Sequence, residues 1–138
     1  MTFGKDKTMS NLPENYAYSE DHEWINASAD EDLAGKTVRV GITSVATDRL
    51  GEVVFAELPE VDDTISAGEQ AGEVESTKSV SDLYAPVSGT VTAVNEDVHD
   101  DYAVINNDPF GEGWLYEVEV SEAGELSNAA DYAAANGL

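Results

Sequence analysis

Cysteine is absent from this chain of 138 residues, so disulfides, thiol nucleophiles and thiolate metal sites are all excluded. Long apolar runs are missing as well. The longest one, Val53 to Ala56, is far too short to span a membrane, and the N-terminus lacks the apolar core of a signal peptide. We therefore predict a cytoplasmic protein without a membrane partner.

Positive charge is scarce. The chain has 6 Lys and Arg against 29 Asp and Glu, which gives a formal net charge of −23. Nucleic acids and anionic lipids are bound through an excess of Lys and Arg, so both are excluded as partners. Self-repulsion destabilises a compact fold in dilute buffer, whereas molar salt shortens the screening length to about 3 Å and removes most of that penalty. The composition therefore predicts a cytosol rich in salt.

Length and apolar content predict one folded domain. A chain of 138 residues with 41% hydrophobic residues can bury a core of its own. Residues 1–14 are polar, lack periodicity and carry Lys5 and Lys7, so we expect a flexible N-terminal tail. A single domain is predicted over residues 15–138. Met9 is an alternative start to Met1.

Short strands separated by turn residues dominate the rest of the pattern. The clearest strand is Lys36–Thr43, where Val38, Val40 and Ile42 alternate with other residues. Further strands are predicted at Asp21–Ile25, Glu52–Leu58, Thr64–Ile65, Ala71–Glu75, Val80–Tyr84, Thr90–Val94 and Trp114–Val120. Strands of this length and spacing favour an all-β sandwich or small barrel.

Two short helices are expected beside the strands. Thr43 or Ser44 can cap a helix over residues 45–50, which Gly51 would close. The alanine-rich stretch Ala129–Gly137 predicts a C-terminal helix. Two acidic stretches are predicted to be solvated loops, Asp30–Asp32 and Asp97–Asp101. Six aromatic residues are assigned to packing: Trp24, Phe55, Tyr84, Phe110, Trp114 and Tyr116.

Lys78 is the only Lys or Arg after Leu50, and twenty Asp and Glu share that segment with it. A surface lysine is the ordinary interpretation, because most lysines lie exposed. A Schiff-base nucleophile needs an amine that loses its proton easily, whereas the neighbouring Glu73, Glu75 and Asp82 favour the protonated ammonium. A carrier lysine that is acylated on a turn needs only exposure and a fixed local shape. This third interpretation fits the sequence best.

The segment Glu75–Gly89 around Lys78 resembles the lipoyl-attachment segment of glycine cleavage system H proteins. Further segments resemble the same family in the same order: His22 to Trp24, Gly41 to Pro59, and Ile105 to Trp114. The resemblance runs from about Tyr16 to Ala135, and several motifs in register make it specific.

The resemblance implies a mainly β fold, a flattened barrel-sandwich hybrid of the lipoyl- and biotinyl-carrier type with short helices. It also places Lys78 at a hairpin tip, which turn signals alone do not do, because Thr77 and Lys78 lack Asn-Gly chemistry. By resemblance, Lys78 carries lipoic acid in amide linkage. The resemblance also implies that the protein itself catalyses no step.

The resemblance also implies partners and further site residues. The partners are glycine decarboxylase (P protein), aminomethyltransferase (T protein), dihydrolipoyl dehydrogenase (L protein) and a lipoate-attaching enzyme. Glu23 and Asp82 match positions that line the cleft for the aminomethyl-loaded lipoyl arm, where a carboxylate binds the protonated amine. The alternative for both is a solvated acid. Asp21 replaces a serine of some members, and Arg49 replaces a frequent histidine and is expected to pair with Asp48 or Glu52.

Other carriers remain open at this point. A biotin carrier also presents a lysine on a hairpin, although that lysine usually lies between methionines rather than between Thr77 and Ser79. A lipoyl domain of a 2-oxo acid dehydrogenase complex normally has an Ala/Pro-rich linker, which this sequence lacks. A third alternative is an H-like relay protein that donates lipoate to other enzymes. The sequence hardly distinguishes this function from the role in glycine cleavage.

Overall fold

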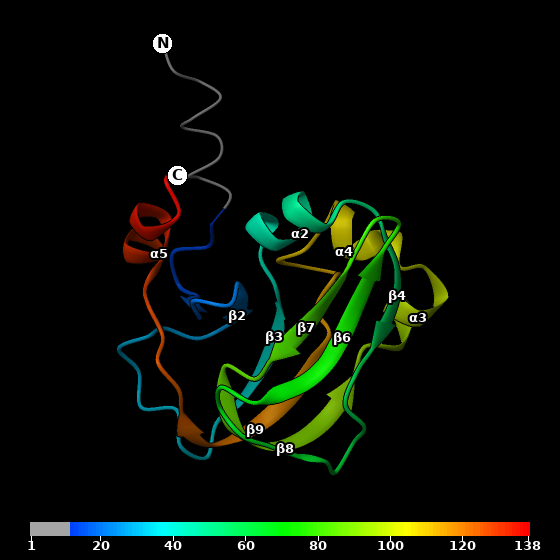
Figure 1. Cartoon of the computed structure of the whole chain (residues 1–138). Coiled ribbons are helices and arrows are strands. Elements are labelled where there is room, and N and C mark those ends of the chain that lie inside the picture. Colours follow the sequence, from blue (N-terminus) through cyan, green and yellow to red (C-terminus); the bar gives the residue numbers. More distant parts are fainter. Residues whose placement is uncertain (1–11) are drawn as a thin grey trace.

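The computed structural model describes residues 12–138 and consists of two antiparallel β-sheets with short helices at their ends (Figure 1). The strands are β1 (Ala17–Tyr18), β2 (Glu23–Ile25), β3 (Thr37–Ile42), β4 (Val53–Glu57), β5 (Thr64–Ile65), β6 (Gln70–Ser76), β7 (Val80–Tyr84), β8 (Val87–Val94) and β9 (Tyr116–Ala123). The helices are α2 (Ser44–Leu50), α3 (Glu96–Asp100), α4 (Ala103–Asn107) and α5 (Ala129–Ala135).

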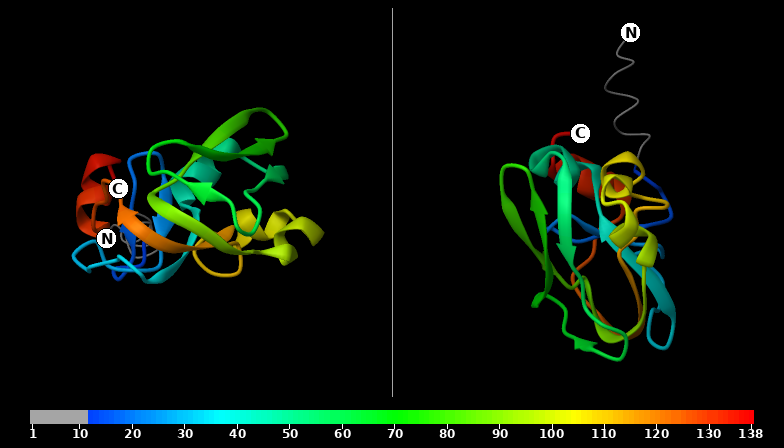
Figure 2. Two further views of the ribbon diagram at one scale, coloured as in Figure 1. Left: turned by 90° about the horizontal axis from the view of Figure 1, so that it is seen from below. Right: turned by 90° about the vertical axis from the view of Figure 1, so that its right-hand side faces the viewer.

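The larger sheet has the strand order β1-β2-β3-β9-β8-β5, and the smaller one has the order β4-β6-β7. The two sheets lie face to face as layers, with α3 and α4 beside one edge of the sandwich (Figure 2). The sheets do not close into a continuous barrel. The predicted mainly β class with short helices, including a C-terminal one, is confirmed.

Strand β3 shows why the main core lies between the sheets. Val38, Val40 and Ile42 are buried, whereas Thr37 and Arg39 on the alternate positions are exposed. This is the predicted alternation, because successive residues of a strand point to opposite faces. Pairing with β9 continues the apolar rows across the sheet, Val38 opposite Val118 and Val40 opposite Tyr116.

A second, smaller core covers the opposite face of β2. Trp24 is 1% exposed and pairs with Gly41, where a Cβ atom would lie only 2.5 Å from the indole ring, so only glycine fits at that position. The indole N–H donates to the carbonyls of Ile42 and Pro109, at 3.1 and 3.0 Å. Helix α5 contributes Tyr132 to this cluster.

Leu12 is 3% exposed and packs in the same cluster, although it lies in the segment predicted to be a flexible tail. The other residues of that predicted tail up to residue 11, with both candidate start methionines, lie outside the described part of the chain.

Both predicted helices are present. The Thr43 side chain accepts a hydrogen bond from the Ala46 N–H at 3.4 Å, and Gly51 ends α2 with a φ of 80° and an N–H bond to the Thr47 carbonyl. The Thr43 hydroxyl also lies 2.8 Å from the hydroxyl of Tyr132, which joins α2 to α5.

Two structural predictions were wrong. The Asp97–Asp101 stretch is mostly helix α3 rather than a loop, because the Asn95 side chain caps its first turn by accepting from the Asp97 N–H, and Val98 is fully buried beneath it. Phe55 was assigned to the core, but its side chain is 42% exposed.

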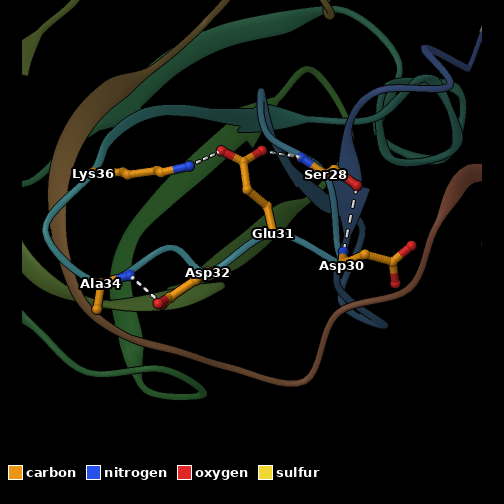
Figure 3. Close-up of polar contacts among 6 residues, drawn as sticks. All are labelled: Ser28, Asp30, Glu31, Asp32, Ala34 and Lys36. Atoms are coloured by element: carbon orange, nitrogen blue, oxygen red, sulfur yellow. Dashed lines mark hydrogen bonds and ion pairs between the residues drawn. The ribbon is translucent and has the colours of Figure 1, made fainter.

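Acidic side chains cover the outside of the fold with few cations to balance them. In the loop between β2 and β3, Lys36 pairs with Glu31, and Ser28 and Asp32 bond to nearby backbone or side-chain groups (Figure 3). The Lys36–Glu31 contact is the single ion pair within residues 12–138. No helix in this range is long and apolar enough to cross a membrane.

We predict that the thermal midpoint rises as KCl is increased from about 0.01 M to molar concentrations, because the Debye length falls from roughly 30 Å to about 3 Å. Differential scanning calorimetry at fixed pH measures this shift. Sucrose at matched osmolarity is the control for effects other than screening. A midpoint that does not respond to KCl would refute the role assigned to charge repulsion.

Candidate functional site

Lys78 lies in the turn that joins β6 to β7, at the end of a hairpin of the smaller sheet. The residue is exposed, and within the described residues its side-chain amine takes part in no hydrogen bond or ion pair. Figure 1 shows this end of the hairpin beside the start of β4, and the Thr77 N–H donates to the Glu52 carbonyl there. The hairpin position implied by the resemblance is therefore where the structure has it.

Serine side chains fix the turn in place of a glycine. The Ser76 hydroxyl oxygen accepts from the N–H groups of Lys78 and Ser79, at 3.3 and 3.0 Å, and the Ser76 N–H donates to the Ser79 carbonyl at 2.8 Å. Such side-chain bonds to local backbone stabilise turns without positive φ angles. This explains how a Thr-Lys pair forms a tip that lacks the usual hairpin dipeptides.

The junction between α2 and β4 packs against the turn that carries Lys78. The Thr77 N–H donates to the Glu52 carbonyl at 3.1 Å, and a Cβ atom on Gly51 would lie 3.3 Å from Cε of Lys78. Asn106 of α4 clamps the same junction, because its amide donates to the Gly51 carbonyl at 2.8 Å and accepts from the Val53 N–H at 2.9 Å. The stem of Lys78 therefore runs over a glycine whose position is fixed by two elements.

Glu23 is a buried acid, only 2% exposed. One oxygen accepts from the Ser19 hydroxyl at 2.9 Å and the other from the Tyr84 N–H at 3.2 Å. Burial raises the pKa of Glu23 to about 8, although these two hydrogen bonds oppose the shift, and Asp21 adds to it. The solvated acid considered as an alternative for Glu23 is therefore wrong.

Asp82 lies on β7, four residues beyond Lys78, and is exposed. Its two oxygens accept from the Gln70 side-chain amide at 3.1 Å and from the Tyr84 hydroxyl at 3.3 Å. The Asp82 carboxylate is the largest cause of the raised pKa of Tyr84. Tyr84 thus connects the two predicted cleft acids, with its backbone bound to Glu23 and its side chain to Asp82.

Arg49 does not pair with Asp48 or Glu52 as predicted. Its guanidinium lies 3.1 Å from Nε2 of His22, whose Nδ1 lies 2.7 Å from the Tyr132 hydroxyl. Burial, followed by the charge of Arg49, lowers the pKa of His22. A neutral imidazole that accepts from Arg49 and donates to Tyr132 satisfies both contacts.

Sequence reasoning missed several residues of this region. Three further residues contact the predicted site residues: Ser19, Tyr84 and Gly51. No local sequence pattern predicts these contacts. A pocket of about 540 Å³ lies next to this region and is lined by Ser19 and Asp21, among others. Lys78, Glu23 and Asp82 do not line it.

A free lysine on a supported hairpin tip of a two-sheet β domain is the arrangement of a carrier domain. A profile of the Glycine cleavage H-protein family matches residues 16–136. The chain is 77% identical over 130 residues to the glycine cleavage system H protein of Corynebacterium aurimucosum, covering 94% of this chain and 99% of that protein. It is 62% identical to that of Corynebacterium jeikeium, covering 93% and 99%.

A solved structure agrees. The crystal structure of a glycine cleavage system H protein from Mycobacterium marinum superposes with a TM-score of 0.89 at 53% sequence identity, covering 92% of this chain and all of that one. This chain belongs to the glycine cleavage H-protein family. It is therefore a lipoyl-carrying shuttle of the glycine cleavage system and not itself an enzyme.

The titration of Glu23 gives a test of its burial. Between the unfolded value of 4.5 and the folded pKa of about 8, the folded protein holds a proton that the unfolded chain releases, so stability falls as pH rises through this window. Glu23→Gln should remove this part of the slope, because an amide can accept from the Tyr84 N–H and donate to Ser19. Urea unfolding of the unchanged protein and of the Glu23→Gln variant from pH 4.5 to 8.5 measures the pH dependence of the free energy of unfolding.

The lowered pKa of His22 contributes with the opposite sign, but it is common to both proteins and cancels in the comparison. Carbon NMR of the Glu23 carboxyl gives the pKa directly. A value near 4.5, or parallel stability profiles of the two proteins, would contradict the assignment.

Proposed function

We propose that Lys78 carries lipoic acid as an amide. The observation that supports this most is the exposed, unpaired amine at the β6–β7 tip, within the described residues. The site suits an acyl group, because Gly51 leaves space along the lysine stem and the turn is held by Ser76 rather than by the lysine side chain. Acylation therefore needs no change in the fold.

Attachment is an ordinary acyl transfer. The Lys78 amine, after it gives a proton to a base of the attaching enzyme, bonds to the acyl carbon of an activated lipoyl donor. The bond from that carbon to the donor's leaving group breaks, and the leaving group keeps the electron pair. When bound, the group supplies a disulfide that accepts a one-carbon amine unit and is reduced.

Glu23 and Asp82 are proposed to bind the protonated amine of the loaded arm. A charge-assisted hydrogen bond from an ammonium group to a carboxylate is about twice as strong as a neutral one. The two acids differ in environment, since Glu23 is buried and Asp82 is exposed. An arriving cation would favour ionisation of Glu23, and the hydrogen bonds from Ser19 and Tyr84 already favour that form.

The proposed partners follow from this role. Glycine decarboxylase would load the arm, the aminomethyltransferase would unload it, and dihydrolipoyl dehydrogenase would reoxidise the dithiol. A lipoate-attaching enzyme would act first, on bare Lys78. We also propose that residues 15–138 act as a single carrier domain, in a cytoplasm whose salt screens the net charge of −23.

Intact mass spectrometry of protein from its native cells tests the attachment. We expect a lipoyl increment that is lost in Lys78→Ala. Lys36→Ala is the matched control, because Lys36 is another exposed lysine but is paired with Glu31, and it should keep the increment. A biotin increment, or a lipoyl increment that survives in Lys78→Ala, would contradict the proposal.

The relay alternative requires an activity measurement. With lipoylated protein, glycine decarboxylase should catalyse glycine-dependent exchange of CO₂ into the carboxyl group of glycine. The unlipoylated protein serves as the control. If the lipoylated protein supports no exchange but donates lipoate to another enzyme, the relay function replaces the shuttle function.

A further inference from the structure

The outer face of the smaller sheet carries an apolar row next to Lys78. Phe55 of β4 pairs with Glu75 of β6, and Glu75 pairs with Val80 of β7. Directly paired residues of an antiparallel sheet point to the same face. Glu75 points outward, because its neighbour Val74 is fully buried on the inner face. Phe55 and Val80 therefore flank Glu75 on the outside.

These two side chains are unusual for their exposure. Phe55 is 42% and Val80 is 59% exposed. Within residues 12–138 only two other large apolar side chains, Val54 and Val61, are similarly exposed. Single exposed apolar residues need no explanation, but these two stand in one row beside the proposed attachment site, with the Phe55 ring turned toward Tyr102 on the β4 side. We call Phe55, Glu75 and Val80 the tip row.

The next row of the same face is acidic. Glu57, Glu73 and Asp82 pair across the three strands. The face therefore presents two apolar side chains with one carboxylate nearest to Lys78, followed by three carboxylates further from it. A complementary surface would offer an apolar patch next to Lys or Arg side chains.

We propose that the tip row is the docking surface for the lipoate-attaching enzyme, through an apolar patch bordered by cationic side chains on that enzyme. This inference rests on the proposed attachment at Lys78. Bare Lys78 projects its amine on a stem of only four methylene groups, so an enzyme that acylates it must approach the hairpin closely. Val80 and Glu75 lie two and three residues from Lys78 along the chain, and they form the β6–β7 pair at the turn end of the ladder.

The other three enzymes act under a weaker constraint. They meet the far end of the lipoyl group, which extends the lysine side chain, and therefore need not touch the hairpin face. The lipoate-attaching enzyme, which acts before acylation, is therefore the partner that most needs to contact the tip row. Exposed apolar side chains that pack into a partner's surface are common anchors of such contacts.

Steady-state lipoylation of the apo protein by a lipoate-attaching enzyme, followed by intact mass, tests the proposal. We expect Val80→Ser to raise KM. The double variant Val80→Ser with Phe55→Ser should raise KM by roughly tenfold, while kcat stays within about twofold in both variants. Val61→Ser is the matched control for Val80→Ser, because Val61 is 52% exposed but lies in the turn beyond the far end of β4, where it lines a pocket with Phe55 and not with Val80. It should keep the KM of the unchanged protein.

A competition assay separates docking from chemistry. The Lys78→Ala protein retains the tip row and should inhibit lipoylation of the unchanged protein, whereas Lys78→Ala with Val80→Ser should inhibit about severalfold less well. Thermal midpoints confirm folding, and Val80→Ser alone decides the test if the Phe55 change, which also removes a ring contact with Tyr102, prevents folding.

Three outcomes would overturn the proposal: an unchanged KM in the folded Val80→Ser protein, a lower kcat at unchanged KM, or an equal effect of Val61→Ser. If the unchanged protein acquires no lipoyl group at Lys78, the proposed attachment itself fails. That result is distinct from a failure of the docking surface alone.

Discussion

The position of Lys78 depends on the junction between α2 and β4. Gly51 adopts a positive φ there, which ends the helix and leaves space for the stem of Lys78. Asn106 holds this junction from α4 with two hydrogen bonds, and the Glu52 carbonyl in turn accepts from the N–H of Thr77. Three segments far apart in sequence thereby present one amine. The proposed acylation of Lys78 requires this, because an attaching enzyme has to meet the amine at one fixed place.

Burial divides the two proposed cleft acids into different roles. Glu23 lies between the sheets and keeps its proton to an unusually high pH, so it adds little charge to an already strongly negative molecule at neutral pH. Asp82 remains exposed beside Tyr84. A cationic amine at the end of β7, where Tyr84 joins the two acids, would meet one acid ready to ionise and one already open to solvent. Tyr84, bonded to both, keeps their relative position.

Local sequence patterns were sufficient where a single element decides the outcome. The alternation in β3 and the cap and glycine of α2 predicted those elements correctly. Patterns failed where a distant element decides. The solvated acid considered for Glu23 was wrong, because Tyr84, 61 positions away, donates to its buried carboxylate. The partner of Arg49, His22, lies 27 positions away. The missed helix α3 is different, because its Asn95 cap is a local signal that was overlooked. The tip itself came from family resemblance.

Charge shapes recognition in this protein in an indirect way. Acids are spread over the whole surface, so electrostatic attraction can speed the approach of a basic partner but gives little information on where it should bind. Apolar exposure is rare by contrast, and two of the exposed side chains, Phe55 and Val80, stand in one row beside Lys78. Non-directional attraction and a local apolar contact together can define a site that neither defines alone. The docking role proposed for these side chains follows from this contrast, because they are surface features that the acidic charge does not repeat elsewhere.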